Sequence, residues 1–158
     1  MHDWWDASDD QVLACPRHAL VEVGGVLPSA GRIVVARLDG ARMMDVDHAL
    51  YEFSAALLFS GYFGWNWDAL SDCLRDLNWL PADGYLIVLE NVPLLLSDET
   101  EERHTLFRIL SRAARAWANP LGRPGGRGVP FRVLLLCDGD QEAAVLRLEL
   151  ADATRKDR

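Results

Sequence analysis

Cysteine is scarce in this chain of 158 residues, and its three copies stand far apart. Cys15, Cys73 and Cys137 form no CxxC pair, and their odd number fits neither a disulfide framework nor a four-cysteine zinc site. The sequence also lacks a P-loop, a GxGxxG pattern and an HExxH pattern. We therefore expect no metal ion and no cofactor. Cys73 falls on an apolar helical stripe, where a small buried residue is the simplest interpretation.

Long apolar runs are lacking as well. The best candidate for a membrane span is interrupted by Glu90, Asn91 and Pro93, whereas a transmembrane helix needs about 20 consecutive apolar residues. The first ten residues contain four aspartates in place of the basic and apolar segments of a secretory leader. We therefore predict a cytoplasmic, reduced protein without a membrane partner.

Positive charge is in deficit. The chain has 16 basic residues, a single lysine among them, against 24 acidic ones, and its formal net charge is −8. Nucleic acids and anionic membranes are themselves negative, so this balance disfavours both as partners. It favours a basic protein partner that is attracted by long-range electrostatics. Half of the residues are hydrophobic, which is enough for one domain with a substantial core.

Three apolar runs are predicted to be strands, and helical patterns separate them. The predicted strands span residues 32–38, 84–89 and 131–136. The predicted helices span residues 45–59, 68–77 and 97–118. Strands that alternate with helices are typical of an α/β domain with a small parallel sheet, and right-handed crossovers place the helices against that sheet.

The two ends of the chain are open to more than one interpretation. Residues 18–23 have the composition of an additional strand. Residues 140–150 fit a capped helix, whereas Leu146, Leu148 and Leu150 alternate as they would in a strand.

The stretch from Tyr62 to Leu74 carries the strongest functional signal. Asn66 is the predicted N-cap of a helix that follows a turn marked by Gly61 and Gly64. With about 100° of rotation per residue, Asp68 and Asp72 fall nearly opposite the apolar stripe of this helix. The stripe consists of Ala69, Leu70, Cys73, Leu74 and Leu77.

Asp68 and Asp72 are like charges one helical turn apart, and such pairs repel each other by about 0.2–0.5 kcal/mol. The plain interpretation is a solvated helix face whose acids suit the positive end of the helix dipole. From spacing alone this is the commoner outcome. The other interpretation is an acidic recognition face, because a basic partner would relieve the repulsion and add charge-assisted hydrogen bonds, especially from arginine.

The same stretch resembles the barstar family of intracellular inhibitors of secreted bacterial ribonucleases. The resemblance rests on Tyr62-Phe63-Gly64, on Asn66, on Asp68-Ala69-Leu70 and on Asp72-Cys73-Leu74, which stand at the family's spacing. It implies an α/β fold with a small three-stranded parallel sheet packed with helices, and it leaves room for extra elements at both ends. We accordingly expect an N-terminal extension at 1–30, a barstar-like domain at 31–138 and a C-terminal extension at 139–158.

The resemblance also implies roles for single residues. Asp72 matches the family's dominant acid, which enters the ribonuclease active site and pairs with its basic residues. Asp68 matches a second acid, which contacts an active-site arginine. Tyr62 matches an aromatic residue that packs on the enzyme's catalytic histidine. Gly64 and Asn66 match loop positions that touch the enzyme.

Several positions depart from the family's pattern. Ser71 stands in place of a large aromatic residue, Arg75 replaces a small hydroxyl residue, and Arg112 aligns approximately with a contacting acid. Trp65 and Trp67 are candidates to take over aromatic anchoring. These departures leave the identity of the target enzyme open. The predicted partner-binding residues are Tyr62, Gly64, Trp65, Asn66, Asp68, Ser71, Asp72 and Arg75.

We therefore predict a protein inhibitor of the antitoxin or immunity type, and not an enzyme. Its predicted partner is a microbial ribonuclease of the barnase-like class, extracellular or delivered, whose active site the acidic helix occludes. Two alternatives stay open. Asp68 and Asp72 could form the acid–base pair of a hydrolase, although the sequence places no histidine or metal cluster with them. The chain could also be a barstar-like interaction module for a toxin that is not a ribonuclease.

Overall fold

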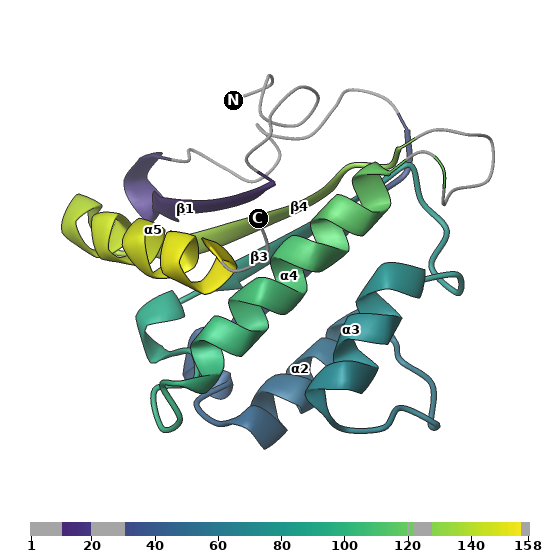
Figure 1. Ribbon diagram of the computed structural model, residues 1–158, viewed down its shortest axis with the longest axis horizontal. Coiled ribbons are helices and arrows are strands. Elements are labelled where there is room, and N and C mark those ends of the chain that lie inside the picture. The colour runs from purple at the N-terminus through teal and green to yellow at the C-terminus, as the bar shows by residue number, and fades with distance from the viewer. Residues whose placement is uncertain (1–10, 20–30, 120, 122–127, 156–158) are drawn as a thin grey trace.

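The computed structural model describes residues 11–19, 31–119, 121 and 128–155. These residues form one parallel sheet with helices packed against it (Figure 1). The strands are β1 (Val12–Pro16), β2 (Ile33–Asp39), β3 (Gly84–Glu90) and β4 (Phe131–Cys137). Their order across the sheet is β1-β4-β3-β2. Every pairing between neighbours is parallel, as expected where helical segments connect successive strands.

The predicted α/β class and parallel sheet are confirmed, but the described part of the chain has four strands instead of three. The additional strand is β1, which precedes the segment 18–23 that the sequence pattern suggested. His18 and Ala19 belong to a short 3-10 helix, η1 (Arg17–Ala19), and residues 20–23 lie outside the described residues. Proline usually argues against a strand, yet Pro16 is tolerated because it is the last residue of an edge strand.

The helices are α2 (Val46–Leu57), α3 (Trp67–Asp76), α4 (Glu102–Ala118) and α5 (Asp140–Thr154). α4 begins later than the predicted start at residue 97, because Leu96 has a left-handed backbone and the Ser97 N–H is bonded in a turn to the Leu94 carbonyl. α5 shows that the tail is helical, and Leu148 on it is exposed. Among the described residues, no helix is long and apolar enough to cross a membrane.

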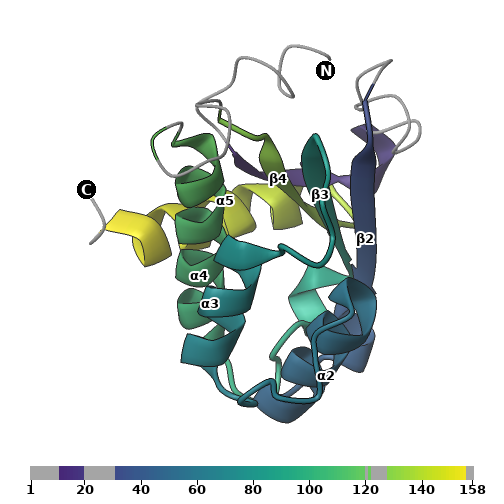
Figure 2. The same cartoon turned by 90° about the vertical axis from the view of Figure 1, so that its right-hand side faces the viewer.

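Alternate residues of the central strands belong to two different apolar clusters. One cluster joins Tyr85, Ile87 and Leu89 of β3 to the inner sides of the helices. The other cluster lies on the opposite face of the sheet and includes Leu86 and Val88. Both faces of β3 are therefore buried, which explains why its sequence is a continuous apolar run. Figure 2 shows α3 and α4 side by side on one side of the sheet.

Candidate functional site

Asn66 fixes the beginning of the acidic helix. Its backbone is extended (φ −145°, ψ 173°), and its side-chain Oδ1 accepts a hydrogen bond of 2.8 Å from the Ala69 N–H. The side-chain Nδ2 donates to the Gly64 carbonyl at 3.3 Å. The predicted N-cap is therefore confirmed. Because the cap sets where α3 begins, it also places Asp68 in the first turn, where the helix dipole favours a negative charge.

The two sides of α3 differ sharply in burial. Leu70 and Leu74 are completely buried in the core, while Asp68 and Asp72 are exposed, the Asp72 side chain by 76%. The helix ends at Leu77, a buried residue with left-handed backbone whose N–H bonds the Cys73 carbonyl. Burial of one side thus holds the carboxylates on the other side toward solvent, as the periodicity predicted.

Two tryptophans attach α3 to α4. The Trp67 indole N–H donates to Glu102 Oε2 at 2.6 Å, near the beginning of both helices. The Trp117 indole N–H donates to the Leu74 carbonyl at 2.7 Å, near the end of both. The helices therefore run in the same direction, and the position of α3 is fixed at both ends. Trp67 is part of this attachment, so it does not provide the exposed aromatic anchor that we considered for it.

The loop before α3 presents two aromatic side chains to solvent. Tyr62 is 98% exposed and Trp65 is 52% exposed. Phe63 between them is buried, and its ring packs on Phe59 and Trp65 with centroids 4.9 and 5.0 Å apart. Trp65 has a positive φ of 54°, a conformation that costs a bulky residue about 1–2 kcal/mol. The buried Phe63 ring supports this loop and the exposed aromatics on it.

Gly64 lies close to the start of α3. A Cβ at this position would stand 3.2 Å from the Cβ of Ala69, which is tighter than an ordinary van der Waals contact. Its carbonyl also accepts the hydrogen bond from Asn66. Gly64 therefore lets the loop approach the helix, so that the exposed aromatics and the two carboxylates lie on neighbouring segments.

The acidic face borders a hollow of about 450 Å³, which is lined by Asp68, Ser71, Asp72, Arg75 and Arg112. Arg75 Nη2 donates to Asp72 Oδ1 at 2.7 Å, and Arg75 Nε donates to the Ser71 carbonyl at 3.3 Å. Arg112 reaches the hollow from α4. The structure thus brings Arg112 next to the predicted acids, although the sequence separates them widely. The family resemblance had aligned Arg112 with a contact position, and the packing of α4 on α3 explains how it reaches the hollow.

A family model described as Barstar (barnase inhibitor) matches residues 33–136. The chain belongs to the barstar family. The match spans β2 through β4 and the helices between them, whereas β1 and α5 lie outside it. A search of curated proteins found no match. The family's description is that of an inhibitor, which acts by binding another protein.

The groups that commonly take part in catalysis lie away from the acidic face or have a raised pKa. The three histidines that the structure describes contact acids elsewhere: His18 with Asp140, His48 with Asp45 and His104 with Asp152. No group of three potential metal ligands occurs in the described part of the chain. Burial raises the pKa of the Cys73 thiol, and the nearby carboxylates of Asp72 and Asp76 raise it further. A thiol with a raised pKa is a poor nucleophile.

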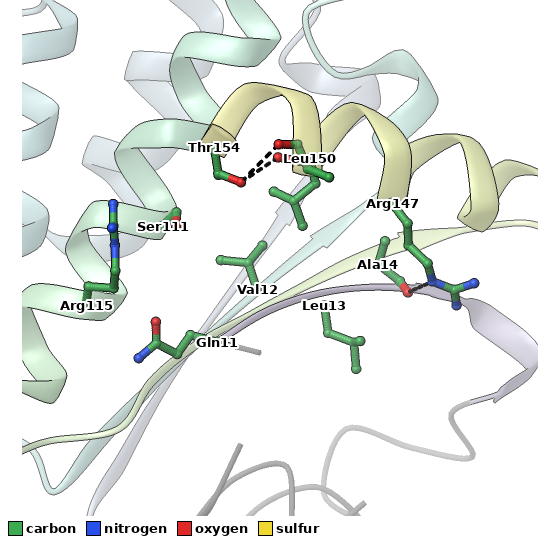
Figure 3. Close-up of a pocket in the computed structure, with 10 residues that line it drawn as sticks. Gln11, Val12, Leu13, Ala14, Ser111, Arg115, Arg147, Leu150 and Thr154 are labelled. Carbon is green, nitrogen blue, oxygen red and sulfur yellow. Dashed lines mark hydrogen bonds between the residues drawn. The ribbon is translucent and has the colours of Figure 1, made fainter. Parts of the chain in front are cut away.

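A second cavity of about 460 Å³ lies between β1, α4 and α5, away from the acidic helix (Figure 3). Its floor is apolar, with Val12 and Leu150, and no carboxylate is among its lining residues. Arg147 Nε donates to the Ala14 carbonyl at 3.3 Å, and the Thr154 hydroxyl donates to the Leu150 carbonyl at 2.9 Å. These side chains attach α5 to β1 and to itself, which is a structural role.

Proposed function

We propose that this protein is a stoichiometric inhibitor of a microbial ribonuclease, of the antitoxin or immunity type, and that it has no enzymatic activity of its own. The observation that carries the proposal is the placement of Asp68 and Asp72 on the solvent side of a helix whose other side is buried and whose ends are attached to α4. Because the carboxylates are held before binding, little conformational entropy is lost when a partner arrives.

The proposed mechanism is occlusion of the active site. Asp72 enters the cleft of the enzyme and occupies the place of a substrate phosphate, and Asp68 contacts a neighbouring cation. Tyr62 and Trp65 supply exposed aromatic area beside the acids, which is the kind of surface that dominates binding energy in many interfaces. Gly64, Asn66, Ser71 and Arg75 complete the proposed contact surface.

Removal of Asp72 tests the proposal. The enzyme's cations would stay buried without a partner, and such truncations cost about 2–5 kcal/mol, a range to which the barnase–barstar complex itself contributed. Asp72→Ala should therefore raise the inhibition constant at least about 30-fold. The control is Asp47→Ala, which removes an exposed acid from α2 and changes the net charge equally.

The measurement is a titration of the protein into small microbial ribonucleases, barnase among them, with RNA cleavage as the readout. The proposal predicts loss of activity at one inhibitor per enzyme, weakened by Asp72→Ala but not by Asp47→Ala. It also predicts slower association at high salt, because salt screens steering by the net charge of −8. Inhibition that survives Asp72→Ala would contradict the mechanism. If no ribonuclease is inhibited, the better explanation is an interaction module that binds a toxin other than a ribonuclease.

We also propose that the protein acts in the cytoplasm, where it protects the cell that makes the toxin. The free thiols of Cys15, Cys73 and Cys137 support a reducing compartment. The proposed barstar-like domain spans residues 31–138, with extensions at 1–30 and 139–158. Expression of the toxin with and without this protein, followed by cell fractionation, tests the compartment.

A further inference from the structure

Counted over the described residues that line it, the hollow at the acidic helix is neutral in formal charge, in contrast to the chain as a whole. Two carboxylates, Asp68 and Asp72, face two guanidinium groups, Arg75 and Arg112, in the same space of about 450 Å³. The chain carries a formal net charge of −8. The negative electrostatic field of the whole chain attracts a basic partner from a distance. On contact, however, the partner meets both negative and positive side chains in the hollow.

Arg75 is committed to the dominant acid. Its Nη2 donates to Asp72 Oδ1 at 2.7 Å, and its Nε holds the Ser71 carbonyl at 3.3 Å, so the side chain lies along the helix. Both partners are substantially exposed, the Arg75 side chain by 48%. Such surface pairs contribute about 0–1 kcal/mol, so an incoming group can rearrange the pair. A cation that approaches Asp72 must nevertheless compete with Arg75.

Arg112 faces the acids because of the tertiary structure. It lies on α4, and the hydrogen bonds of Trp67 to Glu102 and of Trp117 to the Leu74 carbonyl hold α4 against α3. Its backbone position relative to Asp68 is therefore set by packing, and a partner cannot move it away without separating the two helices. A partner that fills the hollow therefore binds next to the backbone position that carries this positive charge.

We propose that the hollow recognises a ribonuclease surface of mixed charge and rejects one that carries cations alone. The partner would place a cation against Asp68 and Asp72 and a carboxylate against Arg75 and Arg112. Arginine binds a carboxylate through two parallel hydrogen bonds, whereas like charges brought together in an interface cost several kcal/mol. Arg75 and Arg112 are then specificity determinants that act partly through repulsion. The inference rests on the proposed function.

Barnase, the enzyme in the family's description, is a suitable probe because its inhibitor recognises it through close charge pairs. Arg112→Glu makes the hollow acidic and should tighten inhibition of barnase at least tenfold. Arg75→Ala should tighten it by a few fold, because Asp72 is released from its intramolecular partner. The control is Arg32→Glu, which changes the net charge equally, lies at the start of the sheet and forms no ion pair among the described residues; it should change inhibition less than twofold.

A second substitution shows where any gain arises. The effect of Arg112→Glu is measured again in the Asp72→Ala background, relative to Asp72→Ala alone, and the gain should disappear there if the acidic helix makes the contact. Thermal unfolding of each variant checks that substitutions at these exposed positions leave the fold intact. Inhibition of barnase that is unchanged or weakened by Arg112→Glu would overturn the proposal. The tightening is measured relative to the wild type, so it is informative even where the wild-type protein is a poor inhibitor.

The carboxylate on the partner is tested with a panel ribonuclease other than barnase that the wild-type protein inhibits. Arg112→Glu should weaken that inhibition at least tenfold, and unchanged inhibition would refute the mixed-charge surface. If no ribonuclease in the panel is inhibited, the proposed function fails. The gain toward barnase would then still establish charge selection by Arg75 and Arg112, so the two failures are distinguishable.

Discussion

Helices α2 and α3 are built with the same local chemistry, yet they differ in what they offer to solvent. Asp45 caps α2 and Asn66 caps α3, each by accepting a hydrogen bond of 2.8 Å from the N–H three residues ahead. Leu58 and Leu77 end the two helices in the left-handed conformation. Each helix also accepts a hydrogen bond from a tryptophan indole near its end. Trp79 donates to the carbonyl of Leu57, the last residue of α2, as Trp117 does to the Leu74 carbonyl of α3. Caps and buried leucines therefore define a helix here without defining its function.

The difference lies in the outward charges. On α2, the acid at the cap is engaged by its own helix, because His48 Nδ1 lies 2.8 Å from Asp45 Oδ1. On α3, the cap is a neutral amide, and the carboxylates of Asp68 and Asp72 point into a hollow that a second helix borders. Asp72 is also paired within its own helix, by Arg75. What sets α3 apart is that its acids share a hollow with Arg112 of a second helix.

The largest expected effect is a loss of stability on removal of a buried leucine, and it should be similar for α2 and α3. Leu50 of α2 and Leu70 of α3 are both fully buried, and replacement of either by alanine should lower the free energy of unfolding by about 3 kcal/mol through lost burial and a cavity. Leu148→Ala on the exposed side of α5 is the control and should cost about 0.5 kcal/mol or less. Urea denaturation measures all three. A much smaller loss for Leu70→Ala would mean that α3 is only loosely packed.

Inhibition of a ribonuclease, in contrast, should depend on α3 and not on α2. Asp68→Ala is expected to weaken ribonuclease inhibition about tenfold, or about 1.4 kcal/mol, which is less than the loss for Asp72→Ala. Its unfolding free energy should change by less than about 1 kcal/mol, because Asp68 is exposed and its attraction to the helix dipole is partly offset by repulsion from Asp72. The inhibition assay compares it with Asp47→Ala on α2. If the two alanine variants inhibit equally well, Asp68 belongs to a solvated face and not to the contact surface.

The caps offer a more selective comparison. Asp45→Ala and Asn66→Ala should each lower the unfolding free energy by about 1 kcal/mol, since each leaves an N–H at the helix start without its acceptor. Only Asn66→Ala should also weaken inhibition, because Asn66 holds the Gly64 carbonyl and thereby the loop that carries Tyr62. Denaturation and inhibition measured on the same samples decide this. If both variants inhibit equally well, the loop that carries Tyr62 does not contribute to the interface.

The smallest effect concerns pH and is confined to α2. The hydrogen bond to Asp45 raises the pKa of His48, so this pair stabilises the folded state fully below the unfolded pKa and loses that contribution as pH rises through the folded pKa. The pKa of Asp45 is lowered, first by the His48 N–H, so its share is lost as pH falls through that value. In Asp45→Asn the pKa of His48 should return toward its ordinary value. An NMR titration that shows no change would contradict this assignment.

Local signals predicted most of the fold. The cap at Asn66, the apolar stripe of α3 and the three long strands are all properties of short windows, and each is confirmed. The predictions failed where distant residues decide. β1 exists because β4 provides a partner for it, and the beginning of α4 depends on the turn at Leu96.

The candidate site divides in the same way. Periodicity placed Asp68 and Asp72 outward, because the helix rotation depends on local sequence alone. It could not place Arg112 beside them, since that requires the packing of α4. Nor could it show that Trp67 turns toward Glu102, or that Trp65 has a left-handed backbone. The two acids and Arg75 were thus visible in the local sequence, whereas Arg112 was indicated only by the family resemblance.

The pairing of β1 with β4 has a consequence for the order of folding. Val12 of β1 pairs with Val133 of β4. β1 is therefore synthesised long before its partner strand, and contacts between residues so far apart in sequence form slowly. The contacts of α3, by contrast, are within reach once α4 has been made. During synthesis the acidic helix can therefore be in place before the sheet gains its last strand. Ribosome-bound chains that end after α4 would be the shortest in which the binding surface can assemble.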